Sequence, residues 1–388
     1  MIRRSVVFGL AAAWSFPAAA QDVRPAAGDR EWGHFVSQLT ACAEAEHVVG
    51  FGAALVRRGR VVARHHHGLA DRDLGRPATD STIYHYGSIT KTLTAVAIMQ
   101  LRDRGLLTLD DPVTRWVPEL RRVHNPFGSM DAITIRMLLS HSAGFQDPTW
   151  PYRGGEPWEP FEPTEWSQLV AMMPYQRIWF EPGSRFGYSN PAFIYLARVI
   201  EALSGDPWEA YVQKNLFAPL GVTRSYFGVT PGWLAAHRSN GYSVRFDEQG
   251  SPRMVANGRD FHPGITIPNG GWNAPLDDLA TWLAFLSGGI PHAVILARSS
   301  LEEMWRPAVA RTADTAEGLS FVIHAGTPLL VSHTGDQGGY HAEIALNPSA
   351  GVAVAFVFNT SYADDNHPRA PACRDLSTRV RAVLGATP

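Results

Sequence analysis

A serine and a lysine three residues apart are candidate catalytic groups. The chain has 34 Lys and Arg residues, and only Lys91 and Lys214 among them are lysine. An arginine stays protonated in a protein, whereas the amine of a desolvated lysine can lose its proton and act as a base. The stretch Ser88-Ile89-Thr90-Lys91 therefore places an amine where it would activate a serine nucleophile. Because this spacing also arises by chance, its surroundings have to support it.

The residues after Gly87 are expected to form a buried helix that carries both groups. Apolar residues occupy most of its circumference, and Gly105 is a suitable end. Ser88 would lie at the helix N-terminus, where free N–H groups and the helix dipole favour an anion. Lys91 would follow one turn later on the same face. Ser88 could instead be only an N-cap, but that role does not explain the buried amine.

Two further short motifs lie downstream. The tripeptide YSN at 188–190 precedes an expected helix, and HTG at 333–335 ends the apolar strand PLLVS. With the S-x-x-K motif, they resemble the three signatures of the penicillin-recognising serine hydrolases. The resemblance is closest to class C β-lactamases, the related D-Ala-D-Ala carboxypeptidases and family VIII esterases. The stretches GLADRDLGRPATDSTIYHYGSITK, ITIRMLLSHSAGF and PNGGWNAPLDDLATWL are also similar to that family.

The resemblance implies covalent catalysis that needs no cofactor. Ser88 would become acylated, Lys91 or Tyr188 would take its proton, and Tyr188 would later protonate the leaving group. Asn190 would bind both Lys91 and a substrate carbonyl through its amide. The backbone N–H groups of Ser88 and Asp336 would form the oxyanion hole.

The HTG tripeptide differs from the corresponding motif of the β-lactamases, which resemble one another in having a lysine at the position of His333. His333 and Thr334 would hold the polar end of the substrate, and Gly335 would let the substrate lie against the strand edge because it has no side chain. An ordinary histidine is mostly neutral at pH 7, so the fixed positive charge for a substrate carboxylate is weakened. The histidine is more similar to the carboxypeptidase, aminopeptidase and esterase branches, and it argues against strong β-lactamase activity.

Three functions remain open. The first is a serine acyl hydrolase of the β-lactamase or D-Ala-D-Ala carboxypeptidase type, acting on a peptide, a β-lactam or a related amide. The second is a carboxylesterase on the same scaffold, with a different pocket shape. The third is a non-catalytic penicillin-binding sensor. No G-x-S-x-G motif occurs, which argues against an α/β-hydrolase. The expected substrate is a small molecule or a short peptide, and the sequence makes no prediction of oligomeric state.

Residues 1–20 have the pattern of a signal peptide. Arg3 and Arg4 precede a short apolar stretch, and three alanines at 18–20 offer a cleavage site before Gln21. The apolar stretch is too short to span a bilayer, and no cysteine near the cleavage site offers a lipid anchor. We expect an exported, periplasmic or secreted protein with no stable membrane anchor.

The net charge argues against nucleic acid as a partner, and the spacing of one histidine run argues against a metal site there. The formal net charge is −2, and loss of the two arginines of the signal peptide would make it more negative. Such a chain has no basic excess for binding nucleic acid. The histidine run at 65–67 lies on an expected strand, where neighbouring side chains point to opposite faces. Because the three rings cannot converge on one ion, we expect no metal site there.

The two cysteines are expected to form a disulfide. Cys42 lies in a predicted N-terminal helix over 30–46, and Cys373 precedes a predicted C-terminal helix over 374–384. The sulfur atoms would meet if these helices pack antiparallel, and an oxidising compartment would favour the bond. Two separate buried thiols are the alternative.

The order of elements predicts an α+β fold of the α/β-sandwich type. A strand hairpin is expected over 49–69, helices over 134–139, 191–203, 207–216 and 276–286, and four strands between 319 and 359. Strands at both ends imply an antiparallel sheet flanked by helices, with an all-helical lobe inserted. Residues 21–388 would form one catalytic domain of the DD-peptidase/β-lactamase-like type, with an α/β lobe (28–87 plus 290–388) and a helical lobe (88–289).

A three-residue repeat, EPWEPFEPTE, covers 156–165. Its period matches a polyproline II helix, which would align the glutamates along one edge. This segment would be either an acidic flap that favours amine-bearing substrates or a stiff loop whose aromatic residues cover the helical lobe.

Overall fold

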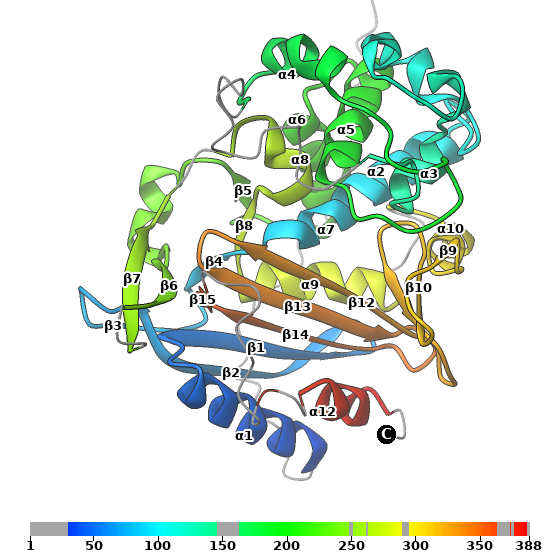
Figure 1. Ribbon diagram of the computed structural model, residues 1–388. Helices are drawn as coiled ribbons and strands as arrows, with labels where there is room; N and C mark the ends of the chain where they lie inside the picture. Colours follow the sequence, from blue (N-terminus) through cyan, green and yellow to red (C-terminus); the bar gives the residue numbers. More distant parts are fainter. Residues whose placement is uncertain are drawn as a thin grey trace, which may run out of the picture.

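A nine-stranded sheet forms the centre of the protein (Figure 1). The computed structural model describes residues 30–145, 163–247, 251–260, 263–288, 295–362, 373 and 376–385. The predicted signal peptide and residues 156–162 of the Glu-Pro repeat lie outside the described residues. The strand order is β3-β2-β1-β14-β13-β12-β11-β10-β9, and neighbouring strands are antiparallel, as predicted.

The two ends of the chain meet in the middle of this sheet. β1 (Gly50–Arg57) and β2 (Arg60–Asp71) form the predicted hairpin, and β1 pairs with β14 (Val352–Phe358) along its other edge. The other strands are β3 (Arg76–Pro77), β13 (Tyr340–Asn347), β12 (Leu330–Gln337), β11 (Val322–His324), β10 (Thr315–Glu317) and β9 (Val309–Ala310). The first and last thirds of the sequence therefore fold together.

Each face of the sheet is covered by helices. α1 (Arg30–Ala45) and α12 (Leu376–Val383) pack on what we call the outer face, where their apolar residues meet Val354 and Phe356 (Figure 1). α9 (Leu276–Leu286) lies on the opposite, inner face, against β1 and β2. The predicted disulfide between Cys42 and Cys373 is confirmed, with a Cα–Cα distance of 4.8 Å.

The segment 88–289 contains the predicted helices. They are α2 (Thr90–Asp103), α3 (Ile135–Leu139), α5 (Asn190–Ser204), α6 (Trp208–Val212) and α9. The segment also contains three short helices that were not predicted, α4 (Trp166–Met172), α7 (Ala218–Leu220) and α8 (Ile267–Gly270), and α10 (Arg298–Met304) follows it. The helix predicted over 207–216 continues beyond α6 as a π-helical turn, Gln213–Phe217.

The expectation of an all-helical segment is wrong in its last third. β6 (Gly241–Phe246) and β7 (Pro252–Gly258) form a hairpin that β15 (Thr360–Tyr362) joins. β8 (Trp272–Pro275) joins β4 (Ile83–His85) to β5 (Tyr226–Phe227) in a third sheet. We keep the division into two lobes as a proposal and assign α9 to the α/β lobe, because it packs on the large sheet.

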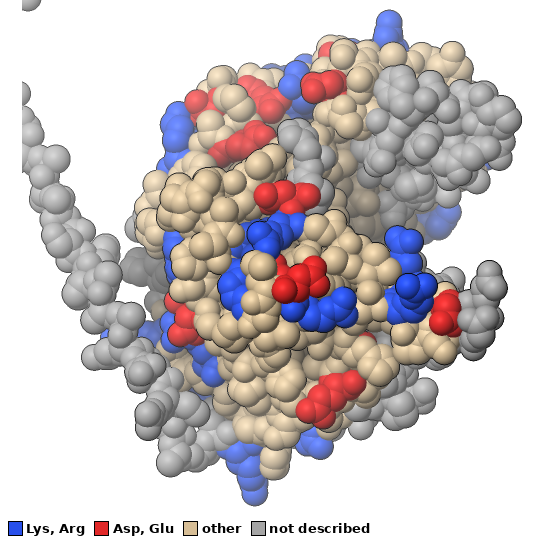
Figure 2. Space-filling model, turned by 90° about the vertical axis from the view of Figure 1, so that its left-hand side faces the viewer, with Lys and Arg blue, Asp and Glu red and all other residues tan. Residues whose placement is uncertain are grey.

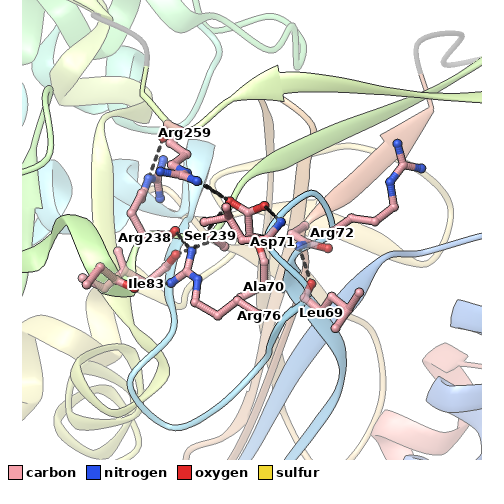
Figure 3. Close-up of polar contacts among 12 residues, drawn as sticks. Leu69, Ala70, Asp71, Arg72, Arg76, Ile83, Arg238, Ser239 and Arg259 are labelled. Atoms are coloured by element: carbon pink, nitrogen blue, oxygen red, sulfur yellow. Dashed lines mark hydrogen bonds and ion pairs between the residues drawn. The ribbon is translucent and has the colours of Figure 1, made fainter.

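Asp71 links the large sheet to the β6–β7 hairpin (Figure 3). Its side chain is 1% exposed and accepts hydrogen bonds from Arg259 Nε and Nη2 at 3.0 and 2.8 Å. Arg76 donates to the carbonyl groups of Ala236 and Arg238, and Arg238 donates to the carbonyl of Arg259. On the face of the protein that contains this hairpin, basic and acidic side chains are intermingled (Figure 2).

Candidate active site

Ser88 lies on a 3₁₀ turn, η1 (Gly87–Ile89), which leads directly into α2. Gly87 has a φ of +48°, a conformation that glycine adopts without strain. The N-cap of α2 is Ile89, and no side chain caps either the turn or the helix. Ser88 is therefore not a helix cap, and its hydroxyl is available for the contacts described next.

Lys91 is fully buried and hydrogen-bonded to three oxygen atoms. Its Nζ donates to Ser88 Oγ at 3.0 Å, to Asn190 Oδ1 at 2.7 Å and to the main-chain carbonyl of Asn269 at 2.8 Å. An ammonium group has three hydrogens, and these three acceptors match them. The amine predicted one turn after Ser88 is thus in contact with it, and Asn190 lies beside both.

Tyr188 completes this group from the start of α5. Its hydroxyl is 2.8 Å from Ser88 Oγ, and Lys91 Nζ lies 4.9 Å from the centre of its ring. The side chain of Ser189, the N-cap of α5, accepts a hydrogen bond from Ala192 N. The structure therefore brings together all three predicted catalytic residues, although they are up to 100 positions apart in sequence.

His141 holds Tyr188 and was not predicted. Its ring stacks on the Tyr188 ring with centroids 4.4 Å apart, and its Nδ1 accepts a hydrogen bond from Ser189 N at 3.0 Å. Burial, together with the charge of Lys91, keeps the pKa of His141 well below its usual value, so the ring is neutral. His141 lies in the stretch LLSHSAGF, which resembles the family, but the sequence alone did not predict that its ring would stack on Tyr188.

The β12 strand brings the second predicted oxyanion donor close to Ser88. Residues Gly335 and Asp336 lie against η1, and a Cβ added to Gly87 would be 3.0 Å from Asp336 N. The predicted reason for Gly335 needs correction, because a side chain there would collide with the main chain of Tyr86 rather than with a substrate. The Asp336 side chain is bonded elsewhere, at 2.5 Å from His341 Nδ1.

His333 is a neutral residue on the inner side of β12. It is 5% exposed, and burial lowers its pKa to about 3, with a further contribution from Lys91. Its Nδ1 lies 2.6 Å from the Thr334 carbonyl. Thr334 is exposed and pairs with Glu343 on β13, so alternation places its side chain on the outer face. Any contribution of Thr334 to substrate binding is therefore expected from its main chain.

One edge of β12 is open beside the site. β11 pairs only with Leu330–Ser332, whereas β13 pairs with β12 as far as Gln337. Within the described chain, His333–Gln337 consequently has a ladder partner on one side only. An extended substrate segment fits such an edge.

An ion pair that sequence did not indicate lies near His333. Arg311 Nη1 is 3.0 Å from Glu317 Oε2, and the guanidinium lies over the Phe186 ring. Glu317 is buried, and burial raises its pKa to about 8 despite the nearby Arg311. The charge of Arg311 and its hydrogen bond to Glu317 oppose this effect of burial and favour the ionised carboxylate.

Among the residues that the structure describes, no three His, Cys, Asp or Glu side chains are arranged to hold a metal ion. The helices within that part of the chain are all too short or too polar to cross a membrane.

A comparison of the sequence with models of known protein families shows which family the chain belongs to. The family model described as "Beta-lactamase" matches residues 35–376. The chain belongs to the beta-lactamase family. Members of the beta-lactamase family are hydrolases that act through serine, so the protein is a serine hydrolase. The resemblance inferred from the three motifs and the fold it implied are both confirmed.

Two relatives and one further solved structure with the same fold are similar to this chain. The chain is 30% identical to esterase EstB of Burkholderia gladioli over 363 residues, which cover 84% of this chain and 90% of the esterase. The octameric penicillin-binding protein homologue from Pyrococcus abyssi has a TM-score of 0.75 and 28% identity, covering 92% of this chain and 78% of its own. D-amino acid amidase from Ochrobactrum anthropi SV3 shares the fold, with a TM-score of 0.73 and 21% identity over 91% of this chain and 98% of the amidase.

Proposed function

We propose that the protein is a carboxylesterase that hydrolyses small esters with an uncharged acyl group through an acyl-Ser88 intermediate. The observation that carries this proposal is the neutral, buried His333 at the position where β-lactamases have lysine. A substrate carboxylate would find no fixed charge on this side chain. The 30% identity to esterase EstB over most of both chains supports the same choice.

Acylation would begin with Ser88 Oγ attacking the ester carbonyl carbon. The Ser88 proton would pass to the phenolate form of Tyr188, whose oxygen lies 2.8 Å away, because Lys91 already donates to three acceptors. The N–H groups of Ser88 and Asp336 would bind the negative oxygen of the tetrahedral intermediate. Its collapse breaks the bond to the alcohol oxygen, which takes the proton from Tyr188.

Deacylation would use the same groups in the reverse direction. A water molecule would give its proton to Tyr188 while its oxygen attacks the acyl carbon. When the second tetrahedral intermediate collapses, Ser88 Oγ leaves, recovers the proton and releases the acid. Lys91 stabilises negative charge on Tyr188 and Ser88 throughout, and Asn190 orients Lys91.

Amide hydrolysis is the second candidate, on a peptide, a β-lactam or a D-amino acid amide. The open edge of β12 at His333–Gln337 favours it, because an amide substrate can pair with main-chain groups there. The name of the D-amino acid amidase that shares the fold points to the same chemistry.

A substrate panel tests the proposal. It contains p-nitrophenyl acetate and butyrate, nitrocefin, D-phenylalanine amide and a D-Ala-D-Ala peptide, each assayed with wild-type protein and with Ser88→Ala. We expect the highest kcat/KM for an ester and no turnover of any substrate by Ser88→Ala. A higher kcat/KM for nitrocefin or for an amide would refute the esterase proposal but leave the serine mechanism intact. Turnover by Ser88→Ala would refute both.

We also propose that the protein is exported to the periplasm or secreted. The disulfide between Cys42 and Cys373 supports this location, because such bonds persist in oxidising compartments. Fractionation of cells that produce the full chain, with detection by an active-site label, would test it.

A further inference from the structure

A hollow lies on the outer face of the sheet, on the other side from Ser88. It has a volume of about 190 Å³ and is bounded by β11–β13 and α12. Apolar side chains form much of its wall, among them Leu330, Ala345, Val380 and Leu384. The residues that act on the substrate in the proposed mechanism do not line it, so it is a separate site.

One acidic and one basic side chain line this hollow. Glu343 projects from β13 and Arg381 from α12, and both line the hollow. No ion pair joins them, and neither forms a hydrogen bond with any residue that the structure describes. Burial raises the pKa of Glu343, with Asp336 adding to the effect and His341 opposing it. A carboxyl group in such surroundings gains from a cationic partner.

Three further polar side chains line the hollow, namely His324, Ser332 and Ser377, and the first two are bonded to each other. His324 Nε2 lies 2.7 Å from Ser332 Oγ, and burial lowers the pKa of His324, which keeps it neutral. The hollow thus offers one carboxyl group, one guanidinium, the hydroxyl group of Ser377 and an apolar wall. A matching ligand has an ammonium group, a carboxylate and an aliphatic body.

We propose that this hollow binds a free α-amino acid with an aliphatic side chain. Its ammonium group would pair with Glu343, its carboxylate would pair with Arg381, and its side chain would lie against Leu330, Val380 and Leu384. Bound in this way, the ligand would bridge α12 and the sheet and would stabilise the folded state. The site faces away from Ser88, so acylation of Ser88 does not prevent binding.

Calorimetric titration and thermal unfolding of the full chain test the proposal with D-leucine and L-leucine as probes. We expect at least one enantiomer to bind and to raise Tm. On the wild-type protein, 4-methylpentanoate and 3-methylbutylamine, which each lack one charge, should bind about tenfold more weakly or worse. Glu343→Gln and Arg381→Gln should each weaken leucine binding by a similar factor.

Arg379→Gln is the matched control, because Arg379 lies on the same helix but does not line the hollow. It should bind leucine as the wild type does, and so should protein whose Ser88 has reacted with a fluorophosphonate. The proposal fails if neither enantiomer binds, if both charge variants bind like the wild type, if either single-charge analogue binds as well as leucine, or if modification of Ser88 abolishes binding.

Discussion

Gly335 lies so close to Tyr86 that a Cβ on Gly335 would be 2.0 Å from the Tyr86 carbonyl oxygen and 3.0 Å from Ser88 N. This approach of two main-chain segments joins the strand that carries Asp336 to the turn that carries Ser88. The spacing of the two proposed oxyanion donors therefore depends on the absence of a side chain at one position.

Gly335→Ala should lower kcat/KM for the best ester by about 100-fold or more, because the added methyl group must push β12 away from η1. Steady-state kinetics and circular dichroism on the same sample would check it. Gly232→Ala is the control, because nothing lies within 4 Å of its added Cβ. A Gly335→Ala variant with normal kcat/KM would contradict the proposed oxyanion hole.

Lys91→Arg should lower kcat by about 10²–10⁴-fold even though the positive charge stays. A guanidinium is larger and planar, and it cannot reproduce the three bonds from one nitrogen to Ser88, Asn190 and Asn269. The same exchange at Lys214, whose side chain is 63% exposed, should leave kcat unchanged. Near-normal turnover by Lys91→Arg would remove the amine from the mechanism.

His333→Lys should change the substrate preference. A lysine there would add the charge that the neutral histidine lacks, so kcat/KM for nitrocefin should rise about tenfold relative to p-nitrophenyl butyrate. His333→Gln keeps the residue neutral and should not produce this change. Because burial keeps the pKa of His333 at about 3, wild-type kcat/KM should show no step from this residue between pH 5 and 9. An unchanged preference in His333→Lys would show that this position does not select substrates.

Loss of the disulfide should affect stability more than activity. The double variant Cys42→Ser, Cys373→Ser should lose about 2–5 kcal/mol of unfolding free energy in urea, because the bond restricts the unfolded chain across 331 positions. Its kcat at 25 °C should stay near that of the wild type, since α1 and α12 cover the face of the sheet opposite Ser88. Thiol titration of the unfolded oxidised protein should detect no free cysteine, and reductant should release two.

Because of Asp71, the free energy of unfolding should decrease at acidic pH. Although burial opposes it, hydrogen bonds from Leu74 N and Arg259 keep the pKa of Asp71 below its usual value in the folded protein. A lowered folded-state pKa means that this stabilisation is complete above the unfolded-state pKa and is lost as pH falls through the folded-state value. Asp71→Asn should therefore be less stable than the wild type at pH 7, and the difference should shrink on acidification towards pH 3. Urea unfolding at several pH values would measure it, and an equal difference at every pH would contradict it.

Much of the fold could be predicted because local pattern and tertiary structure agree. The long strands β1, β12, β13 and β14 have apolar residues on both faces, since helices cover each side, and they read as strands without knowledge of their partners. The hairpin of β6 and β7 was missed. Its residues Arg245, Phe246 and Arg253 are exposed, and its register depends on β15, more than 100 residues later.

In the active site, too, some residues could be predicted from local sequence and others could not. Ser88 and Lys91 were predictable because one helical turn fixes their spacing. Tyr188 was predictable because its motif follows the S-x-x-K motif in the order typical of the family. The carbonyl of Asn269 could not be predicted, because every residue has one and only the fold selects which carbonyl meets Lys91. The same holds for His85, which lies 3.0 Å from Gln337 Oε1 and links β4 to the end of β12.

The scarcity of lysine has a practical consequence for handling this enzyme. Lys91 is fully buried, so Lys214 is the one lysine side chain within reach of an amine-directed reagent. A succinimidyl-ester dye or an activated resin should therefore couple at that position and at the amino terminus, leaving Ser88 accessible. Immobilised or fluorescent preparations attached at no more than these two positions can be made without engineering the chain.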